Sequence, residues 1–175
     1  MPTIGVAVAV PDPWGEQLRK HRSSFGDPLA DTIPTHVTLL PPTEVEPGDL
    51  PIFTDHLASV ATGHAPFEIY LRGTATFRPV SPVVFMSLAQ GISECEELAG
   101  AVRESLLCEQ PRFPYHPHVT VAHDVADAAL DTAFEALADY DCRFGVDRFQ
   151  LYLHHPDKGW VCEREFELQA PAADW

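Results

Sequence analysis

Two short stretches of the sequence combine a side chain that can transfer protons with a side chain that can bind an anion. They lie at residues 36–38 and 118–120, both read His-Val-Thr, and each is followed by an aliphatic residue. Residues i and i+2 of an extended strand face the same side, so each stretch presents an imidazole beside a hydroxyl. One such stretch means little in a chain with 9 histidines. Two copies, both in apolar strand-like sequence and both shortly after a proline, indicate a functional pair.

The chemistry open to such a pair is acid–base catalysis at phosphorus. An imidazole titrates near neutral pH, so one histidine can take a proton from water or a hydroxyl while the other protonates a leaving oxygen. The threonine hydroxyls can donate hydrogen bonds to the non-bridging phosphate oxygens and stabilise charge that develops in the transition state. This scheme requires no metal and no other cofactor.

Strand and helix signals surround the first stretch in an order that would hold it in place. Alternating β-branched and small residues predict a strand over 3–10, and the small residues leave room for a close neighbour on one face. A helix is predicted from Asp12 to Gly26, and a second helix, capped by Asp49, follows the motif strand. A strand over 67–77 closes the first half.

The second half repeats this order. A strand over 83–89 is followed by a capping box that begins at Ser93 and opens a helix, then by the second motif strand and a further helix. In that further helix, Phe134 is predicted to face the core. Two strands, over 143–154 and 160–168, complete the half.

The repeated order of elements favours an internal duplication, with repeats of roughly 1–80 and 81–175. The predicted fold class is α+β, with residues 1–175 forming a single bilobed domain. In it, duplicated strand-helix-strand units related by a pseudo-dyad place antiparallel sheets on either side of a central cleft. The two His/Thr pairs would then converge on that cleft.

Charge and hydropathy limit the possible partners. The net charge is −15, and 11 basic residues are scattered among 26 acidic ones without a basic run. No extended nucleic-acid surface is expected, because such surfaces neutralise many phosphates, whereas a small anionic ligand remains compatible. No apolar run approaches the roughly 18 residues of a membrane span, and the first residues lack the basic segment of a signal peptide. We therefore expect a cytoplasmic monomer with no membrane partner.

A metal site is the main alternative that the histidines raise. His116, His118 and His123 lie close in sequence, but 118 and 123 face opposite sides of a strand, and no acidic or cysteine ligand accompanies them. The four cysteines show no C-x-x-C spacing, so neither a zinc site nor a disulfide framework is predicted. We therefore expect no metal-ligating residues and no bound metal ion.

The paired H-x-T-[LV] motifs resemble those of the two-histidine (2H) phosphoesterase superfamily, in particular the bacterial proteins called 2′-5′ RNA ligases or RNA 2′,3′-cyclic phosphodiesterases. The resemblance covers essentially the whole chain and includes the pattern F-x-I-x-L-x-G-x-x-x-F over 67–77 and the proline and histidine that precede Val119. It implies a bilobed α+β fold and metal-independent opening of 2′,3′-cyclic phosphates to 2′-phosphates. For some members it also implies reversible 2′-5′ RNA ligation.

Carried over to this sequence, the resemblance implies four catalytic residues, with His118 as the base and His36 as the acid, although the near-symmetry of the motifs leaves these two roles exchangeable. The four are His36, Thr38, His118 and Thr120. Phe77 and Tyr115 flank the predicted cleft and are candidates for stacking a base. Many bacterial members have an arginine where this chain has His123, and three other cations could substitute for it: Arg78, Arg112 or Lys158.

Other functions remain compatible with the same residues. A non-catalytic nucleotide-binding or regulatory module of this fold would bind without turnover, and 2′-5′ RNA ligation could be the main activity. A metalloprotein built on the histidine-rich second half would retain metal on purification. The preferred interpretation is a phosphodiesterase acting on a small cyclic-phosphate nucleotide or a short RNA end.

Overall fold

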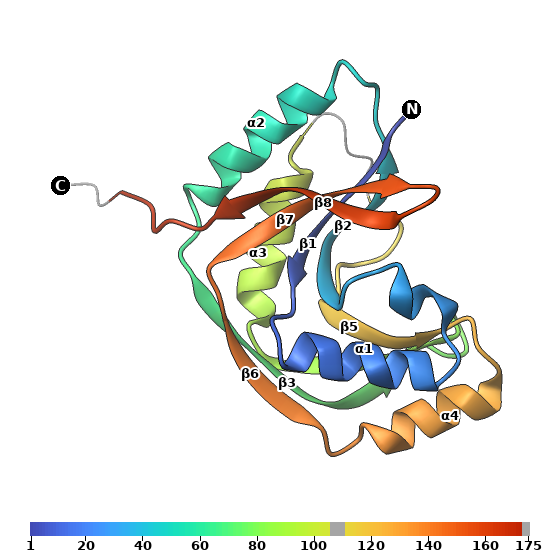
Figure 1. The fold of residues 1–175 in the computed structure, drawn as a ribbon. Helices are drawn as coiled ribbons and strands as arrows, with labels where there is room; N and C mark the ends of the chain where they lie inside the picture. The colour runs from blue at the N-terminus through green and yellow to red at the C-terminus, as the bar shows by residue number, and fades with distance from the viewer. Residues whose placement is uncertain (106–110, 173–175) are drawn as a thin grey trace.

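The protein has an α+β fold built on two four-stranded antiparallel sheets, as Figure 1 shows in a computed structural model that describes residues 1–105 and 111–172. The strand order is β2-β1-β7-β8 in the first sheet and β5-β4-β3-β6 in the second. The predicted fold class is therefore confirmed. The elements are β1 Thr3–Ala9, α1 Trp14–Ser24, a 3-10 helix η1 Pro28–Asp31, β2 His36–Glu44, α2 Leu50–Ala61, β3 Phe67–Thr76, β4 Val83–Gln90, α3 Ile92–Arg103, β5 His118–His123, α4 Asp127–Ala136, β6 Asp141–Val146, β7 Arg148–His155 and β8 Gly159–Glu167.

The first sheet places the first motif beside a strand, β1, whose facing residues have small side chains. Ile4, Val6 and Val8 of β1 are fully buried, as the alternating pattern predicts. The antiparallel register sets Ala7 opposite Thr38 and Ala9 opposite His36. Because alanine carries little side chain, the imidazole and hydroxyl of β2 have free space beside them.

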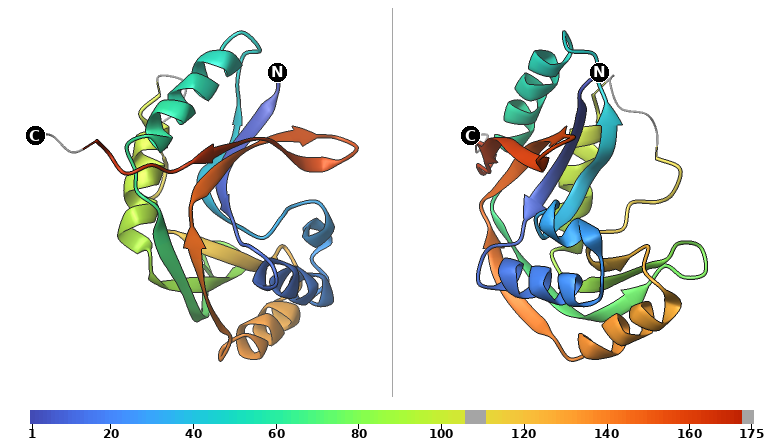
Figure 2. Two further views of the ribbon diagram at one scale, coloured as in Figure 1. Left: turned by 60° about the vertical axis from the view of Figure 1, so that its left-hand side comes forward. Right: turned by 45° about the vertical axis from the view of Figure 1, so that its right-hand side comes forward.

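The second sheet carries the second motif on β5, where one of the facing residues is a large phenylalanine. β5 pairs with β4, and the register sets Thr120 opposite Phe85 and His118 opposite Ser87. Figure 2 shows α2 and α3 on one side of the molecule and α1 and α4 at the other end. One continuous apolar core joins residues of both sheets and of all four α-helices, so the two motif strands are held in a single rigid frame.

The two sheets are not made from consecutive halves of the chain. β3 precedes residue 80 but lies in the second sheet, and β7 and β8 return to the first sheet beside β1. The order strand, helix, motif strand, helix, strand does occur twice, from β1 to β3 and from β4 to β6. That these repeats, roughly 1–80 and 81–175, arose by duplication stays a prediction.

Three local expectations are wrong. The strand predicted over 143–154 is two strands, because β6 pairs with β3 in one sheet and β7 with β1 in the other, with Asp147 between them. Phe134 is 37% exposed, and the buried side of α4 is formed by Leu130 and Ala133. The third helix begins at Ile92, before Ser93, and its N-cap is the left-handed Gly91, where an added Cβ would lie 2.7 Å from the Glu68 carbonyl oxygen.

Among residues 1–105 and 111–172, no helix is long and apolar enough to cross a membrane.

Candidate active site

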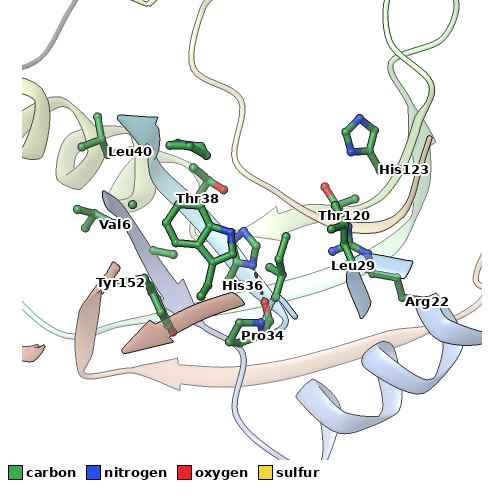
Figure 3. A pocket seen from close by; sticks show the side chains of 15 residues that line it. Val6, Arg22, Leu29, Pro34, His36, Thr38, Leu40, Thr120, His123 and Tyr152 are labelled. Atoms are coloured by element: carbon green, nitrogen blue, oxygen red, sulfur yellow. Dashed lines mark hydrogen bonds between the residues drawn. The ribbon is translucent and has the colours of Figure 1, made fainter. Parts of the chain in front are cut away.

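The two motif strands, β2 and β5, contact each other, and a cavity of about 460 Å³ opens where they meet. His36, Thr38 and Thr120 belong to its lining, and so does His123 at the end of β5. Figure 3 shows His36 and Thr38 on one side of this cavity, with Thr120 and His123 on the other. His118 is not part of the lining, but it is near enough for its charge to affect the pKa of His36.

Both motif histidines are oriented by the same local hydrogen bond. The Nδ1–H of His36 donates to the carbonyl of Pro34 over 2.6 Å, and the Nδ1–H of His118 donates to the carbonyl of His116 over 2.7 Å. A carbonyl can only accept, so Nδ1 must carry the proton in both rings. Each neutral imidazole therefore keeps its lone pair on Nε2, which is the atom left for proton transfer.

Burial lowers the pKa of His36 below its ordinary value of 6.5, and the positive charges of Arg22 and His118 lower it further. Burial is also the main cause that lowers the pKa of His118, with a smaller contribution from the charge of His116. The carbonyl bonds of the two rings oppose these effects. Both rings are therefore mostly neutral at pH 7, ready to act as bases, and one of them must gain a proton before it can act as an acid.

An aromatic cluster surrounds the histidine of the second motif. The ring of Phe77 meets His118 edge-on with centroids 5.0 Å apart, and the ring of Phe85 lies 5.1 Å from it. Both phenylalanines also contact His116. These rings remove water from one side of His118, which accounts for the burial that lowers its pKa.

The residues predicted to bind substrate do not gather at the cavity. Phe77 packs against His118, Arg78 forms an ion pair with Asp131 over 2.9 Å, and Arg112 is exposed. The hydroxyl of Tyr115 donates to the Thr38 carbonyl over 2.7 Å. None of these four, nor Lys158 in the β7–β8 turn, lies in the cavity lining. Their part in substrate binding stays a prediction.

Among the polar and aromatic residues of the cavity, sequence reasoning missed three: Arg22, Tyr152 and Trp160. Arg22 falls at the helical spacing of the buried side of α1, but a sequence gives no sign of the partner that lets a cation be buried. Tyr152 and Trp160 come from β7 and β8, and only the pairing of β7 with β1 brings them to the motif.

The cavity has two chemically different parts. His36, both motif threonines, Arg22 and His123 supply its polar groups. Its apolar groups include Leu29, Ile33, Tyr152 and Trp160. Such a site fits a ligand with an anionic group joined to a flat or apolar group.

Within the part of the chain that the structure describes, no group of three or more His, Cys, Asp or Glu side chains is placed to hold a metal ion. His116, His118 and His123 do not form such a group among those residues. Cys95, Cys142 and Cys162 are free thiols, and Cys108 lies outside the described residues.

A family model of the 2′-5′ RNA ligase superfamily matches residues 10–158. The chain belongs to this superfamily of two-histidine phosphoesterases, as the motifs predicted. It is similar to a putative phosphoesterase of Oceanobacillus iheyensis, with 25% identity over 94% of this chain and 96% of that protein. A putative phosphoesterase of Halalkalibacterium halodurans is 27% identical over the same shares of the two chains.

Solved structures show the same fold. Escherichia coli LigT in complex with 3′-AMP superposes with a TM-score of 0.67 at 18% identity, covering 96% of this chain and 99% of LigT. LigT has also been solved with phosphate, at a TM-score of 0.65 and 18% identity over 96% of this chain and 98% of LigT. A Thermus thermophilus protein superposes with a TM-score of 0.66 at 22% identity, over 97% of this chain and 99% of that one.

Proposed function

We propose that the protein is a metal-independent phosphodiesterase that opens 2′,3′-cyclic phosphates of nucleotides or RNA ends to 2′-phosphates. The observation that carries this proposal is the pair of matching imidazoles. Each Nδ1 donates to the carbonyl two residues upstream, each Nε2 has no hydrogen-bond partner among the described residues, and both rings stand on strands that meet at one cavity. Two such groups on opposite sides of a phosphorus atom suit an in-line displacement.

In the proposed reaction, Nε2 of His118 takes a proton from water as the water oxygen attacks phosphorus. The bond from phosphorus to O3′ breaks, and the protonated Nε2 of His36 gives its proton to O3′. The product carries a 2′-phosphate and a free 3′-hydroxyl, and the two imidazoles have exchanged protonation states. The hydroxyls of Thr38 and Thr120 donate to the non-bridging oxygens. This assignment of acid and base rests on family resemblance, because the two histidines make the same kind of Nδ1 hydrogen bond to a carbonyl.

The charge distribution favours a small substrate. The chain has 11 basic residues against 26 acidic ones. Several of the basic side chains are already paired, including Arg19, Arg78 and Arg148. One or two phosphates can be bound at the cavity, but no long row of phosphates can be neutralised. The complexes of LigT with 3′-AMP and ATP show that a protein of this fold binds mononucleotides.

The decisive experiment is turnover of 2′,3′-cyclic nucleotides in EDTA, followed by identification of the product. We expect the 2′-phosphate, and a strict requirement for an added divalent metal would contradict the proposal. A series of substrates from mononucleotide to long RNA, at two salt concentrations, tests the substrate size. Efficiency that climbs with RNA length and loses the gain in salt would contradict the small-substrate part.

The same assays separate the alternatives. Nucleotide binding without turnover would identify a non-catalytic module, and joining of RNA ends faster than hydrolysis would identify a ligase. The monomeric state and the cytoplasmic location stay predictions, for which gel filtration and cell fractionation are the measurements.

A further inference from the structure

Arg22 is a buried cation at the active-site cavity. The buried polar or charged residues among those described are Arg22, Asp27 and Gln150, and Arg22 is 7% exposed. It lies in the last turn of α1, which packs beside β5, and its side chain lines the same cavity as His36 and Thr120. Burying a guanidinium is costly unless another group compensates its charge.

Asp27 compensates this charge and fixes its position. The carboxylate accepts hydrogen bonds from Arg22 Nε over 2.7 Å, from the Leu29 backbone N–H over 3.0 Å and from the His123 backbone N–H over 3.1 Å. The last bond ties the loop after α1 to the end of β5, 96 residues away in sequence. Arg22 is thereby held in a fixed place relative to the second motif.

The ion pair leaves part of the guanidinium unused. Its hydrogen bond to Asp27 is made by Nε, and no bond of the terminal amino groups to a described residue is found. Among the described residues, every fully buried side-chain nitrogen or oxygen has a partner. The terminal amino groups of Arg22 are therefore reached from the cavity and can donate to a ligand there.

The place of these donors suits a phosphate. Figure 3 shows Arg22 and Thr120 on one side of the cavity, facing His36 and Thr38. The positive charge of Arg22 acts across this space on His36 and is one of the causes that lower the pKa of that imidazole. A planar guanidinium with two free amino groups matches the geometry of phosphate oxygens, and a buried aspartate behind it keeps it from turning away.

We propose that Arg22 is the phosphate-binding cation of this site, donating from its terminal amino groups to a non-bridging oxygen of a phosphate held between the two His-x-Thr motifs. The identity of the ester rests on the proposed function, but the binding of a phosphate group does not. The cation comes from α1 rather than from β5, where residue 123 is a histidine. Arg78, Arg112 and Lys158, the cations considered from sequence, lie outside the cavity lining.

The test is the binding of inorganic phosphate, measured by calorimetry on the intact protein. The double variant Arg22→Met/Asp27→Asn removes both charges together, so that no lone buried carboxylate remains. We expect its affinity for phosphate to fall about tenfold or more, because a hydrogen bond to a charged group is lost. The matched control is Arg19→Met on the same helix, since Arg19 pairs with Glu16 and Asp31 outside the cavity lining. Its affinity should stay within about twofold of the wild type.

A folded double variant that binds phosphate as well as the wild type would overturn the proposal, and so would a wild-type protein that does not bind phosphate at millimolar concentration. If the double variant does not fold, the wild-type protein decides. The NMR signal of the Arg22 Nε–H, assigned by its loss in Arg22→Lys, should shift on titration with phosphate, and an unmoved signal overturns the proposal. Absence of cyclic phosphodiesterase activity would refute the proposed function and leave this binding result standing.

Discussion

In β2, His36 faces an open cavity with a guanidinium across it, whereas in β5, His118 is packed against the rings of Phe77 and Phe85. The two imidazoles nevertheless make the same hydrogen bond to a carbonyl two residues upstream. The orientation of each ring is thus encoded within a few residues, and a repeated sequence reproduces it. The environment of each imidazole, in contrast, is formed by elements far away in the chain. These different environments can make one histidine an acid and the other a base.

The largest expected effect comes from removing either histidine. His36→Ala and His118→Ala should each lower kcat on a cyclic nucleotide by at least about 10², because in the proposed mechanism each ring carries one of the two proton transfers. The double variant should be little worse than either single variant, since the two groups act as a unit. Steady-state kinetics on purified variants of intact fold provides the measurement.

His64→Ala is the matched control for both variants. His64 makes the same kind of Nδ1 hydrogen bond, to the Val60 carbonyl over 2.8 Å, but it lies outside the cavity lining. Its variant should keep near-normal activity. A substrate with a p-nitrophenolate leaving group sharpens the comparison, because the variant that lacks the acid should recover on it while the variant that lacks the base should not. Equal recovery of both variants would show that the assigned roles are wrong.

This comparison also shows what the sequence could predict. The period-two alternation and the two His-Val-Thr stretches place the motif residues on strands, where residues two apart share a face. The buried faces of α2 and α3 follow in the same way from helical spacing. The fold class could therefore be predicted from local patterns. The alternation does not predict that His123 lines the cavity together with Thr120, because the pairing of β4 with β5 shifts its register between these residues.

The rest depends on partners that are distant in sequence. The sequence does not reveal that β6 and β7 belong to different sheets, because strands of both sheets show the same alternation of buried and exposed residues. Arg22 could not be recognised, since its burial depends on Asp27 and on the bond from Asp27 to residue 123. The aromatic side chains of Tyr152 and Trp160 reach the cavity only through the return of β7 to β1.

Removing the threonine hydroxyls should have the next largest effect. Thr38→Val and Thr120→Val keep the shape of the side chain and remove a donor to the charged oxygens, so kcat/KM should fall by about 10² for each. Thr43→Val, also on β2, is the control, because its hydroxyl donates to the Pro41 carbonyl. An unchanged kcat/KM in Thr120→Val would show that the second motif uses its histidine without its threonine.

The pH optimum of kcat/KM should lie on the acid side of the ordinary pKa of histidine. The active form carries one proton on the pair, and the pKa of each ring is lowered from 6.5 by burial first. The optimum of kcat/KM, which lies midway between the two pKa values, should therefore fall below pH 6.5. Above the optimum the proposed acid loses its proton, so kcat/KM should decline as the pH rises through neutrality. An optimum above pH 7 would contradict the lowered pKa values.

The smallest effect, and the most selective one, is expected from Phe77→Leu. The smaller side chain admits water next to His118, so the pKa of His118 should rise, whereas the pKa of His36 should not rise with it. Titration of the imidazole signals by NMR measures both values in one experiment. Phe134→Leu is the control, because Phe134 is partly exposed on α4. Equal shifts of the two histidines would show that their environments are coupled rather than separate.

The return of β7 and β8 to the first sheet also sets the order in which the enzyme can be assembled during synthesis. The sheet that carries His118 is built from one continuous stretch, β3 to β6, and can form as soon as those residues leave the ribosome. The sheet that carries His36 needs β7, whose Gln150 side chain accepts a hydrogen bond from the backbone N–H of Ala9, 141 residues earlier. A nascent chain that ends before β7 therefore holds a prearranged second motif and an unfinished first one. The sheet that carries the first motif can be completed only after β7 has been synthesised and has paired with β1.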